Sequence, residues 1–285
     1  MKQILWGTDL HYNFLDDDEI AKFHEYQKIL LKGRSAKFTA LSDTAETVDT
    51  KCIVVSGDIS EGHQLIDHLK ALHSQMNLPV YYVCGNHDYW GTSFSSLRPQ
   101  LIELANSSDI KWLGAVDYVR LDDAHALVGH DGWYDAMLGD WKGSRFVMND
   151  WFKIGEFLGL YEQELITRLR ETALFSAKHI DNGIDKAIAA GFKQLIIVTH
   201  VPPFQDIAAY RGRPTEAHAL PWYTSGIMGD HIMQKAIENP HVQFTVFCGH
   251  THDAMSKKIC NNLIAHCGAA AYGHPAFHDV ALVNT

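Results

Sequence analysis

Five short apolar runs, each followed at once by a polar loop, constrain the fold of this chain most. The runs cover residues 4–6, 52–55, 80–83, 195–198 and 242–248. Each run is rich in β-branched or aromatic residues and is short enough to be a buried strand. Between them, apolar residues at three- and four-residue spacing predict helices over 61–75 and 165–180, with a break of the second at Asn182-Gly183. Strand and helix therefore alternate, which predicts an α/β fold.

The remaining apolar segments extend this plan to two sheets. Segments 118–121 and 126–128 flank Asp122-Asp123 and predict a hairpin, and segments 255–260, 263–267 and 280–283 predict further strands. Two mixed β-sheets packed face to face, with helices outside, accommodate all of them as a four-layer α-β-β-α sandwich. No composition break marks an interdomain linker, so residues 1–285 are predicted to form a single domain.

Composition narrows the possible partners. The chain has 24 Lys and Arg against 34 Asp and Glu, a net charge of -10, which disfavours binding to a nucleic-acid backbone. No apolar stretch reaches the roughly 18 residues of a membrane span, and no signal-peptide pattern precedes residue 9. The five cysteines fit no zinc-knuckle spacing and are predicted to be reduced, buried thiols. We therefore expect a cytoplasmic protein without a membrane or nucleic-acid partner.

The loops that follow the apolar runs carry the chemistry. They contain Asp9-Leu10-His11, Gly57-Asp58, Gly85-Asn86-His87-Asp88, His200 and Gly249-His250-Thr251-His252. Because the carboxyl ends of strands in an α/β sheet meet at one rim, these segments should converge. Asp, Asn and His supply the oxygen and nitrogen ligands that first-row divalent metals accept. An extended strand end would project Asp9 and His11 to the same side, and likewise His250 and His252. The sequence thus predicts a metal site at the carboxyl-end strand loops.

In order along the chain, these motifs read DxH, GD, GNH(D/E), H and GHxH. This order resembles that of the calcineurin-like metallophosphoesterase superfamily, whose fold is the double-sheet sandwich predicted above. The resemblance implies a dinuclear metal-dependent phosphoesterase with two divalent ions, of Mn, Fe or Zn. It implies that Asp9, His11 and His252 bind one ion, that Asn86, His200 and His250 bind the other, and that Asp58 bridges both. It further implies that His87 serves the leaving group and that Asp88 orients its ring.

The resemblance also implies a mechanism and a substrate class. Two ions would lower the pKa of a bridging water, whose hydroxide attacks a small phosphodiester or phosphomonoester in line, and His87 would serve the departing oxygen. A serine/threonine-type protein phosphatase or a nuclease of the same superfamily is the alternative. A non-catalytic interaction module on this fold is disfavoured, because such modules lose ligands and this chain retains all of them. The run Gly57 to Glu61 departs from many members, which leaves the subfamily open, and the sequence specifies no oligomeric state.

Two long segments, 131–157 and 201–226, interrupt the strand-helix rhythm and are predicted to form rim loops that shape the pocket. Within and beside them we predict four substrate-binding residues, namely His130, Arg211, Arg213 and Trp222. Arg211 or Arg213 would pair with a phosphate or carboxylate of the substrate. The alternative is that the aromatic residues only pack the loops onto the domain, with 130–133 forming a turn beneath a buried Trp. The acidic run 16–19 is interpreted as the first turn of a helix.

Overall fold

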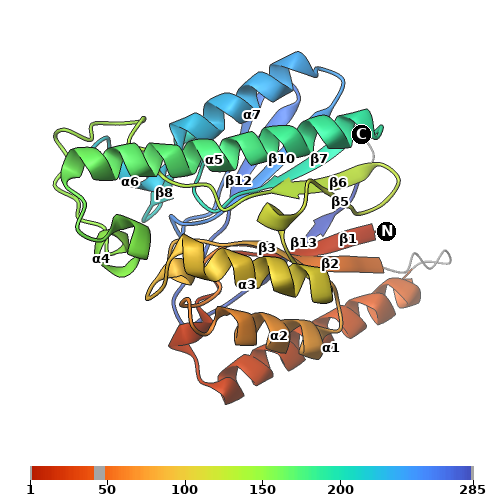
Figure 1. Cartoon of the computed structure of the whole chain (residues 1–285). Coiled ribbons are helices and arrows are strands. Elements are labelled where there is room, and N and C mark those ends of the chain that lie inside the picture. The colour runs from red at the N-terminus through yellow and green to blue at the C-terminus, as the bar shows by residue number, and fades with distance from the viewer. Residues whose placement is uncertain (1, 42–48, 284–285) are drawn as a thin grey trace.

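The computed structural model describes residues 2–41 and 49–283 and contains two mixed β-sheets (Figure 1). The first sheet has the order β13-β1-β2-β3-β4. Its strands are β1 (Lys2–Gly7), β2 (Asp49–Ser56), β3 (Val80–Val83), β4 (Ile110–Trp112) and β13 (Phe277–Ala281). The strands from β1 to β4 pair in parallel and β13 pairs antiparallel with β1, so the four parallel strands end at the same edge of the sheet.

The second sheet has the order β11-β12-β10-β7-β6-β5. Its strands are β5 (Val119–Arg120), β6 (His125–Gly129), β7 (Gln194–Val198), β10 (Gln243–Cys248), β11 (Met255–Cys260) and β12 (Leu263–Cys267). The four inner strands are parallel, and the edge strands β5 and β11 are antiparallel to their neighbours. Trp6, Val54, Leu127, Val198 and Phe247 are among the residues that fill the core between the two sheets.

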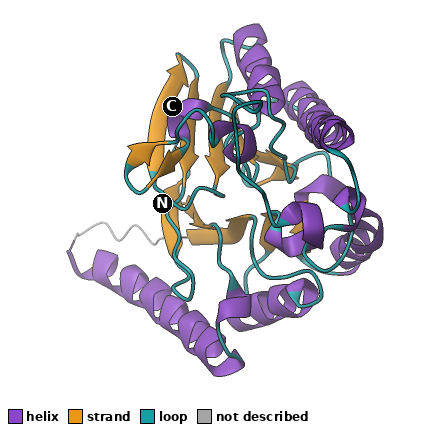
Figure 2. Cartoon of the chain, turned by 90° about the vertical axis from the view of Figure 1, so that its left-hand side faces the viewer, coloured by secondary structure: helices purple, strands orange, loops and turns teal. Residues whose placement is uncertain are grey.

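Helices cover the outer face of each sheet (Figures 1 and 2). α1 (Asp17–Leu41), α2 (Leu65–Met76) and α3 (Phe94–Ser107) lie outside the first sheet, and α5 (Glu162–Ala189) and α7 (Gly226–Glu238) lie outside the second. The predicted four-layer sandwich is therefore confirmed. Short elements gather at the left end in Figure 1: α4 (Asp150–Lys153), α6 (Leu220–Tyr223) and the two-stranded β8 (Ala209–Tyr210) and β9 (Arg213–Pro214). In the described part of the chain, five 3-10 turns complete the fold, at Tyr12–Phe14, His87–Tyr89, Leu113–Ala115, Gly155–Phe157 and Gln205–Ile207.

The five apolar runs coincide with β1, β2, β3, β7 and β10, and the predicted hairpin is β5–β6. Some boundaries were predicted incorrectly, including the starts of two elements. The last strand begins at Phe277 instead of 280, and α2 begins at Leu65 instead of 61, because a turn closed by the bond from Gln64 N to Glu61 O (2.9 Å) precedes it.

The predicted break at Asn182-Gly183 is wrong, since α5 runs through it. A Cβ at Gly183 would lie 2.3 Å from the Asp117 carbonyl oxygen, so this glycine permits close packing and does not end the helix. Asn182 Nδ2 donates to Asp117 Oδ1 at the same contact (2.7 Å).

The start of α1 is confirmed by a reciprocal cap. Glu19 N donates to Asp16 Oδ1 (2.8 Å) and Asp16 N donates to Glu19 Oε2 (3.0 Å), which satisfies two donors of the first turn. All five cysteines are free, as predicted, and four of them are buried; the exception is Cys260, which is partly exposed in the edge strand β11. Within residues 2–41 and 49–283, no helix combines the length and the apolar character needed to cross a membrane.

Candidate metal centre

The predicted ligand side chains meet at the carboxyl ends of β1, β2, β3, β7 and β10. Among residues 2–41 and 49–283, three groups have ligand atoms within 4.8 Å of one another. They are Asp9 with His11 and His252, Asp58 with His200 and His250, and His11 with Asp58 and His87. The first two groups correspond to the two ligand sets that the family resemblance implied.

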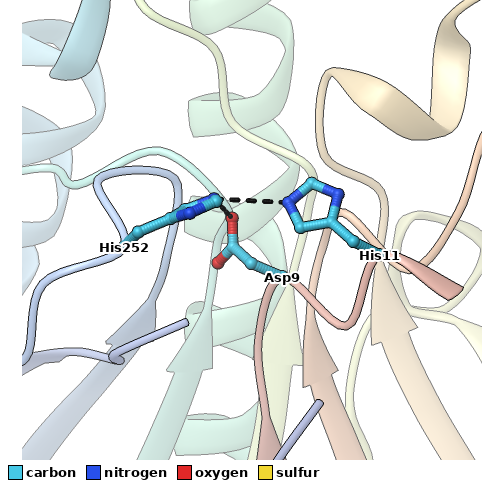
Figure 3. Close-up of side chains that lie close together, drawn as sticks. All are labelled: Asp9, His11 and His252. Atoms are coloured by element: carbon cyan, nitrogen blue, oxygen red, sulfur yellow. Dashed lines mark hydrogen bonds and ion pairs between the residues drawn. The ribbon is translucent and has the colours of Figure 1, made fainter. Parts of the chain in front are cut away.

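In the first set, the His252 ring approaches both Asp9 and His11 (Figure 3). Its Nε2 lies 3.2 Å from Asp9 Oδ1 and 3.2 Å from His11 Nε2. Ligand atoms held at about 2.0–2.2 Å from one ion lie roughly 3.0–3.4 Å apart, so this spacing fits a common ion.

The second set has the same spacing. His200 Nε2 and His250 Nδ1 are 3.2 Å apart, and Asn86 Oδ1 lies 3.1 Å from each. Asp58 Oδ1 is 3.4 Å from His200 Nε2, whereas Asp58 Oδ2 is 3.8 Å from His11 Nε2. One carboxylate thus faces both sets, one oxygen to each.

The backbone at these ligands adopts a left-handed conformation. Among the described residues, eight other than glycine have positive φ, and five are predicted ligands: Asp9 (49°), His11 (46°), Asp58 (51°), His250 (70°) and His252 (63°). The expectation of extended strand ends was wrong, because sharp turns bring these side chains together. Each such residue costs of order 1 kcal/mol or more, and strain of this kind gathers at functional sites.

A glycine makes room for the shared carboxylate. A Cβ at Gly85 would lie 2.1 Å from Asp58 Oδ1, so any other residue would collide with the group that faces both sets. The Gly-Asn-His-Asp motif thus begins with glycine for a steric reason.

Backbone carbonyls fix two of the histidine tautomers. His200 Nδ1 donates to Ser56 O (2.9 Å), and His250 Nε2 donates to Trp222 O (3.1 Å). The opposite nitrogen of each ring then faces the site and, when it is not protonated, can bind a metal ion through its lone pair.

The pKa values of the clustered histidines and carboxylates shift in different directions. Burial would lower the pKa of His200, but the charge of Asp58, its bond to Asp58 and the charge of Asp9 outweigh this and raise the pKa to about 10. At His250, in contrast, burial dominates and lowers the pKa to about 4. Burial would raise the pKa of Asp9, but the bond from His252 and the charge of His200 lower it to about 2. Ionised carboxylates and neutral imidazoles are the protonation states that bind divalent ions, so an ion bound by His200 would displace the proton that its raised pKa implies.

A buried carboxylate outside the motifs orients Asn86. Asp150 Oδ1 accepts from Asn86 Nδ2 (2.9 Å) and from Trp90 Nε1 (2.7 Å), and its Oδ2 accepts from Tyr134 OH (2.8 Å). The amide nitrogen is thereby turned away and Asn86 Oδ1 faces the histidines. Sequence reasoning missed Asp150, which lies 64 positions from its partner.

The proposed role of Asp88 needs correction. Its carboxylate accepts from the backbone N–H groups of Ile59 (2.9 Å), Ser60 (2.8 Å) and Gly85 (2.8 Å) and does not orient His87, whose Nδ1 has no partner among the described residues. Asp88 therefore joins the loop after β2 to the loop after β3.

His87 is held by stacking instead. Its ring lies on Trp90, with centroids 3.5 Å apart and an interplanar angle of 28°. Its Nε2 lies 4.0 Å from Asp58 Oδ2, and burial lowers the His87 pKa to about 4. His87 thus sits at the edge of the metal centre, 8% exposed.

Two predicted substrate-binding side chains do not face the site. His130 is 0% exposed and packs against Trp112 and against His179 of α5, so its turn directs it into the core. Trp222 is 4% exposed and donates its indole N–H to Ser144 Oγ (2.7 Å). Both predictions are corrected: His130 is a core residue, and Trp222 contacts His250 through its backbone carbonyl oxygen.

Arg211 and Arg213 do line a cavity beside the metal centre. The cavity has a volume of about 610 Å³, and its walls include Tyr210, Tyr223 and Thr251. Thr251 stands between two ligand histidines, and the Tyr223 ring lies 5.2 Å from that of His250. The cavity therefore opens next to the second ligand set.

An aromatic pair that the sequence did not reveal borders the first ligand set. The Tyr272 ring lies 4.5 Å from His11, 5.0 Å from His252 and 4.7 Å from Phe14. Both aromatic side chains are about half exposed, at 49% for Tyr272 and 52% for Phe14. They form a second wall of the site.

Comparisons with known proteins agree with this geometry. A family model described as calcineurin-like phosphoesterase matches residues 3–254, and no curated protein matches the sequence. A phosphopantetheinyl hydrolase from Mycobacterium tuberculosis is similar in structure, with a TM-score of 0.62 and 13% identity over 95% of this chain and 90% of that chain. A dimetal phosphatase from Danio rerio gives a TM-score of 0.54 and 14% identity over 94% and 87%. At these identities the likeness shows a common fold.

The family match covers every predicted ligand, and the five motifs that carry these ligands meet at one edge of the sandwich. The chain therefore belongs to the calcineurin-like phosphoesterase family and is a metal-dependent phosphoric ester hydrolase.

Proposed function

We propose that this chain binds two divalent ions, of Mn, Fe or Zn, and hydrolyses small phosphoesters, with diesters favoured over monoesters. The observation that carries the proposal is the position of Asp58, which lies within ligand distance of both sets. Asp9, His11 and His252 would hold one ion, and Asn86, His200 and His250 the other. When bound, the ions would supply Lewis-acid stabilisation of the phosphoryl charge and lower the pKa of water.

The chain's own groups supply the rest of the reaction. His87 has a buried imidazole with a free Nδ1, and Trp90 fixes the plane of its ring. An N–H of this ring is available to the departing ester oxygen at the edge of the site. Asp58 Oδ1 also accepts a hydrogen bond from the backbone N–H of His87 (2.9 Å), so this bond fixes the position of His87 relative to the shared carboxylate.

The surroundings of the site favour a small substrate. A volume of about 610 Å³ is in the usual range of small-molecule pockets. The chain carries a net charge of -10, and Arg211 and Arg213 are the cations that line this cavity. Two cations suit one further anionic group and are too few to track a nucleic-acid strand.

A substrate panel tests the proposal. Turnover of bis-nitrophenyl phosphate, nitrophenyl phosphate, cyclic nucleotides and single-stranded DNA would be compared at one Mn²⁺ concentration. We expect hydrolysis of the small esters and little action on DNA. Fast, salt-sensitive cleavage of DNA with little action on the small esters would make the chain a nuclease.

A further inference from the structure

We propose that the cavity beside the metal centre is a subsite for a second anionic group of the substrate, which Arg211 and Arg213 bind. The inference rests on the proposed function and narrows the substrate to phosphoesters that carry another phosphate or a carboxylate. Four observations support it: backbone strain at Arg211, unpaired guanidinium groups, attachment of their hairpin to a ligand loop, and aromatic walls between the two sites.

The hairpin of β8 and β9 places an arginine where the backbone disfavours one. Its two central residues, Arg211 and Gly212, both have positive φ, at 53° and 72°. Turns with this conformation favour Asn-Gly, and a long side chain at the first position is strained. Of the seven other described non-glycine residues with positive φ, five are predicted metal ligands. Backbone strain like that at Arg211 is thus otherwise found mostly at the metal centre.

Neither guanidinium is neutralised. Within the part of the chain that the structure describes, no carboxylate forms an ion pair with Arg211 or Arg213, whereas Arg98, Arg120 and Arg168 each have an acidic partner. Arg211 only lies over the Tyr210 ring, at 5.2 Å. The acidic residue that lines the cavity, Glu216, is 3.4 Å from His218 Nδ1. Two free arginines in a chain of net charge -10 form a local anion site.

The hairpin is fastened to the metal centre. Gly212 N donates to Asp253 Oδ2 (2.8 Å), and Asp253 directly follows the predicted ligand His252. Thr251 and Tyr223 line the same cavity and adjoin His250. One molecule can therefore place its reacting phosphate at the metal centre and its second anion at the arginines.

Aromatic side chains line the space between the two ends. Phe146 stacks on His218 with centroids 5.4 Å apart, and it meets Tyr223 edge to face at 6.1 Å. All three residues line the cavity. Such walls suit a flat group, for example a nucleobase, between the two anionic groups of the substrate.

Matched substrates that differ by one anion test the subsite. Adenosine 3′,5′-bisphosphate would be compared with adenosine 5′-phosphate for a phosphate, and O-phosphotyrosine with tyramine phosphate for a carboxylate. The quantity measured is the ratio of kcat/KM within each pair, with Mn²⁺ present. We expect the wild type to prefer the substrate with the second anionic group in at least one pair. The double variant Arg211→Asn with Arg213→Gln should lower that preference about 10- to 100-fold by raising KM, because hydrogen bonds to charged groups are worth about tenfold or more each.

Two controls separate binding from folding and from long-range charge. Asparagine tolerates positive φ, so Arg211→Asn should leave Tm unchanged or raise it. Arg145→Gln removes one exposed charge from the neighbouring rim loop without altering the cavity, and should leave the ratio unchanged. A wild type without preference in either pair, or a double variant with the wild-type ratio, would overturn the subsite.

Failure of the proposed function gives a different result. If metal-loaded wild type hydrolyses none of these esters, the hydrolytic proposal fails, and calorimetric titration with adenosine 3′,5′-bisphosphate then tests the subsite by itself. Weaker binding by the double variant would support it, and equal binding would overturn it.

Discussion

Asp58 connects the two ligand sets, and its replacement tests whether two ions are held. Asp58→Asn preserves size but removes the charge that offsets two dications, so we expect loss of at least one ion and of most activity, with the fold retained. Metal analysis and circular dichroism would measure this. Asp206→Asn, which removes an exposed carboxylate from a 3-10 turn, is the control. Near-normal turnover by Asp58→Asn would contradict the shared role.

His87 is expected to act on the leaving group and not on the metals. His87→Asn should spare metal content and lower the rate roughly 100- to 10,000-fold, the usual range for general acid-base help. The loss should shrink for nitrophenyl esters, whose leaving group needs little assistance. Equal losses for good and poor leaving groups would indicate phosphate positioning. Loss of metal would instead make His87 a ligand, as in the third group of ligand atoms.

Asp150 is expected to increase the affinity for the second ion by orienting Asn86. Asp150→Asn keeps the shape but places an amide where Asn86 Nδ2 donates, so affinity for one ion should fall about 10- to 100-fold, as for other partners of metal ligands. Titration of activity with Mn²⁺ measures this. Asp135→Asn is the matched control, because Asp135 is also buried in 131–157 but bonds to Ser225 and Ile227 N. An equal effect of both variants would refute the role of Asp150.

The convergence of the proposed ligands could be predicted because each of them follows a strand. The supporting residues could not. Asp150 reaches Asn86 only because segment 131–157 folds back over the site. Asp88 belongs to a motif, but its partners are backbone groups of another loop, which no spacing reveals. His130 follows a strand as the ligands do, but sequence position does not indicate to which side of a sheet a turn points its side chain.

At the scale of elements, the packing of α5 depends on Gly183. Alanine usually stabilises an exposed helix position relative to glycine by about 1 kcal/mol. Here the added Cβ meets the Asp117 carbonyl at 2.3 Å, so we expect Gly183→Ala to destabilise by about 1–3 kcal/mol, with a lower Tm. Glu171→Ala, at an exposed position of the same helix, is the control. A higher Tm for Gly183→Ala would show that α5 can shift without cost.

The central strands could be predicted because burial on both faces gives them continuous apolar runs. β13 lies at a sheet edge and is exposed along most of its length, so its pattern marks its limits poorly. The hairpin of β8 and β9 has two residues in each strand, too few for any periodicity. Its position follows from its bond to Asp253, which joins segments 41 residues apart.

At the scale of the molecule, metal binding should stabilise the whole sandwich. Each ligand set combines residues from the first sheet with residues from the second, so ions bind the folded chain and not the unfolded one. A bound ion that is present at 100 times its Kd adds about 2.7 kcal/mol to the free energy of unfolding. We expect chelation to lower Tm and abolish activity, and Mn²⁺ to restore both. In Asp58→Asn, chelation should lower Tm by less than in the wild type. Full activity in metal-free protein would contradict the assignment.

The division of the ligands between the two sheets also orders events during biosynthesis. Asp9, His11, Asp58 and Asn86 leave the ribosome early, whereas His200, His250 and His252 are among the later residues of the chain. Neither ligand set is complete in a nascent chain that stops before residue 250, and the first set also needs residue 252. Stable capture of the ions thus follows translation of nearly the whole chain, and a truncated product lacks the means to retain them.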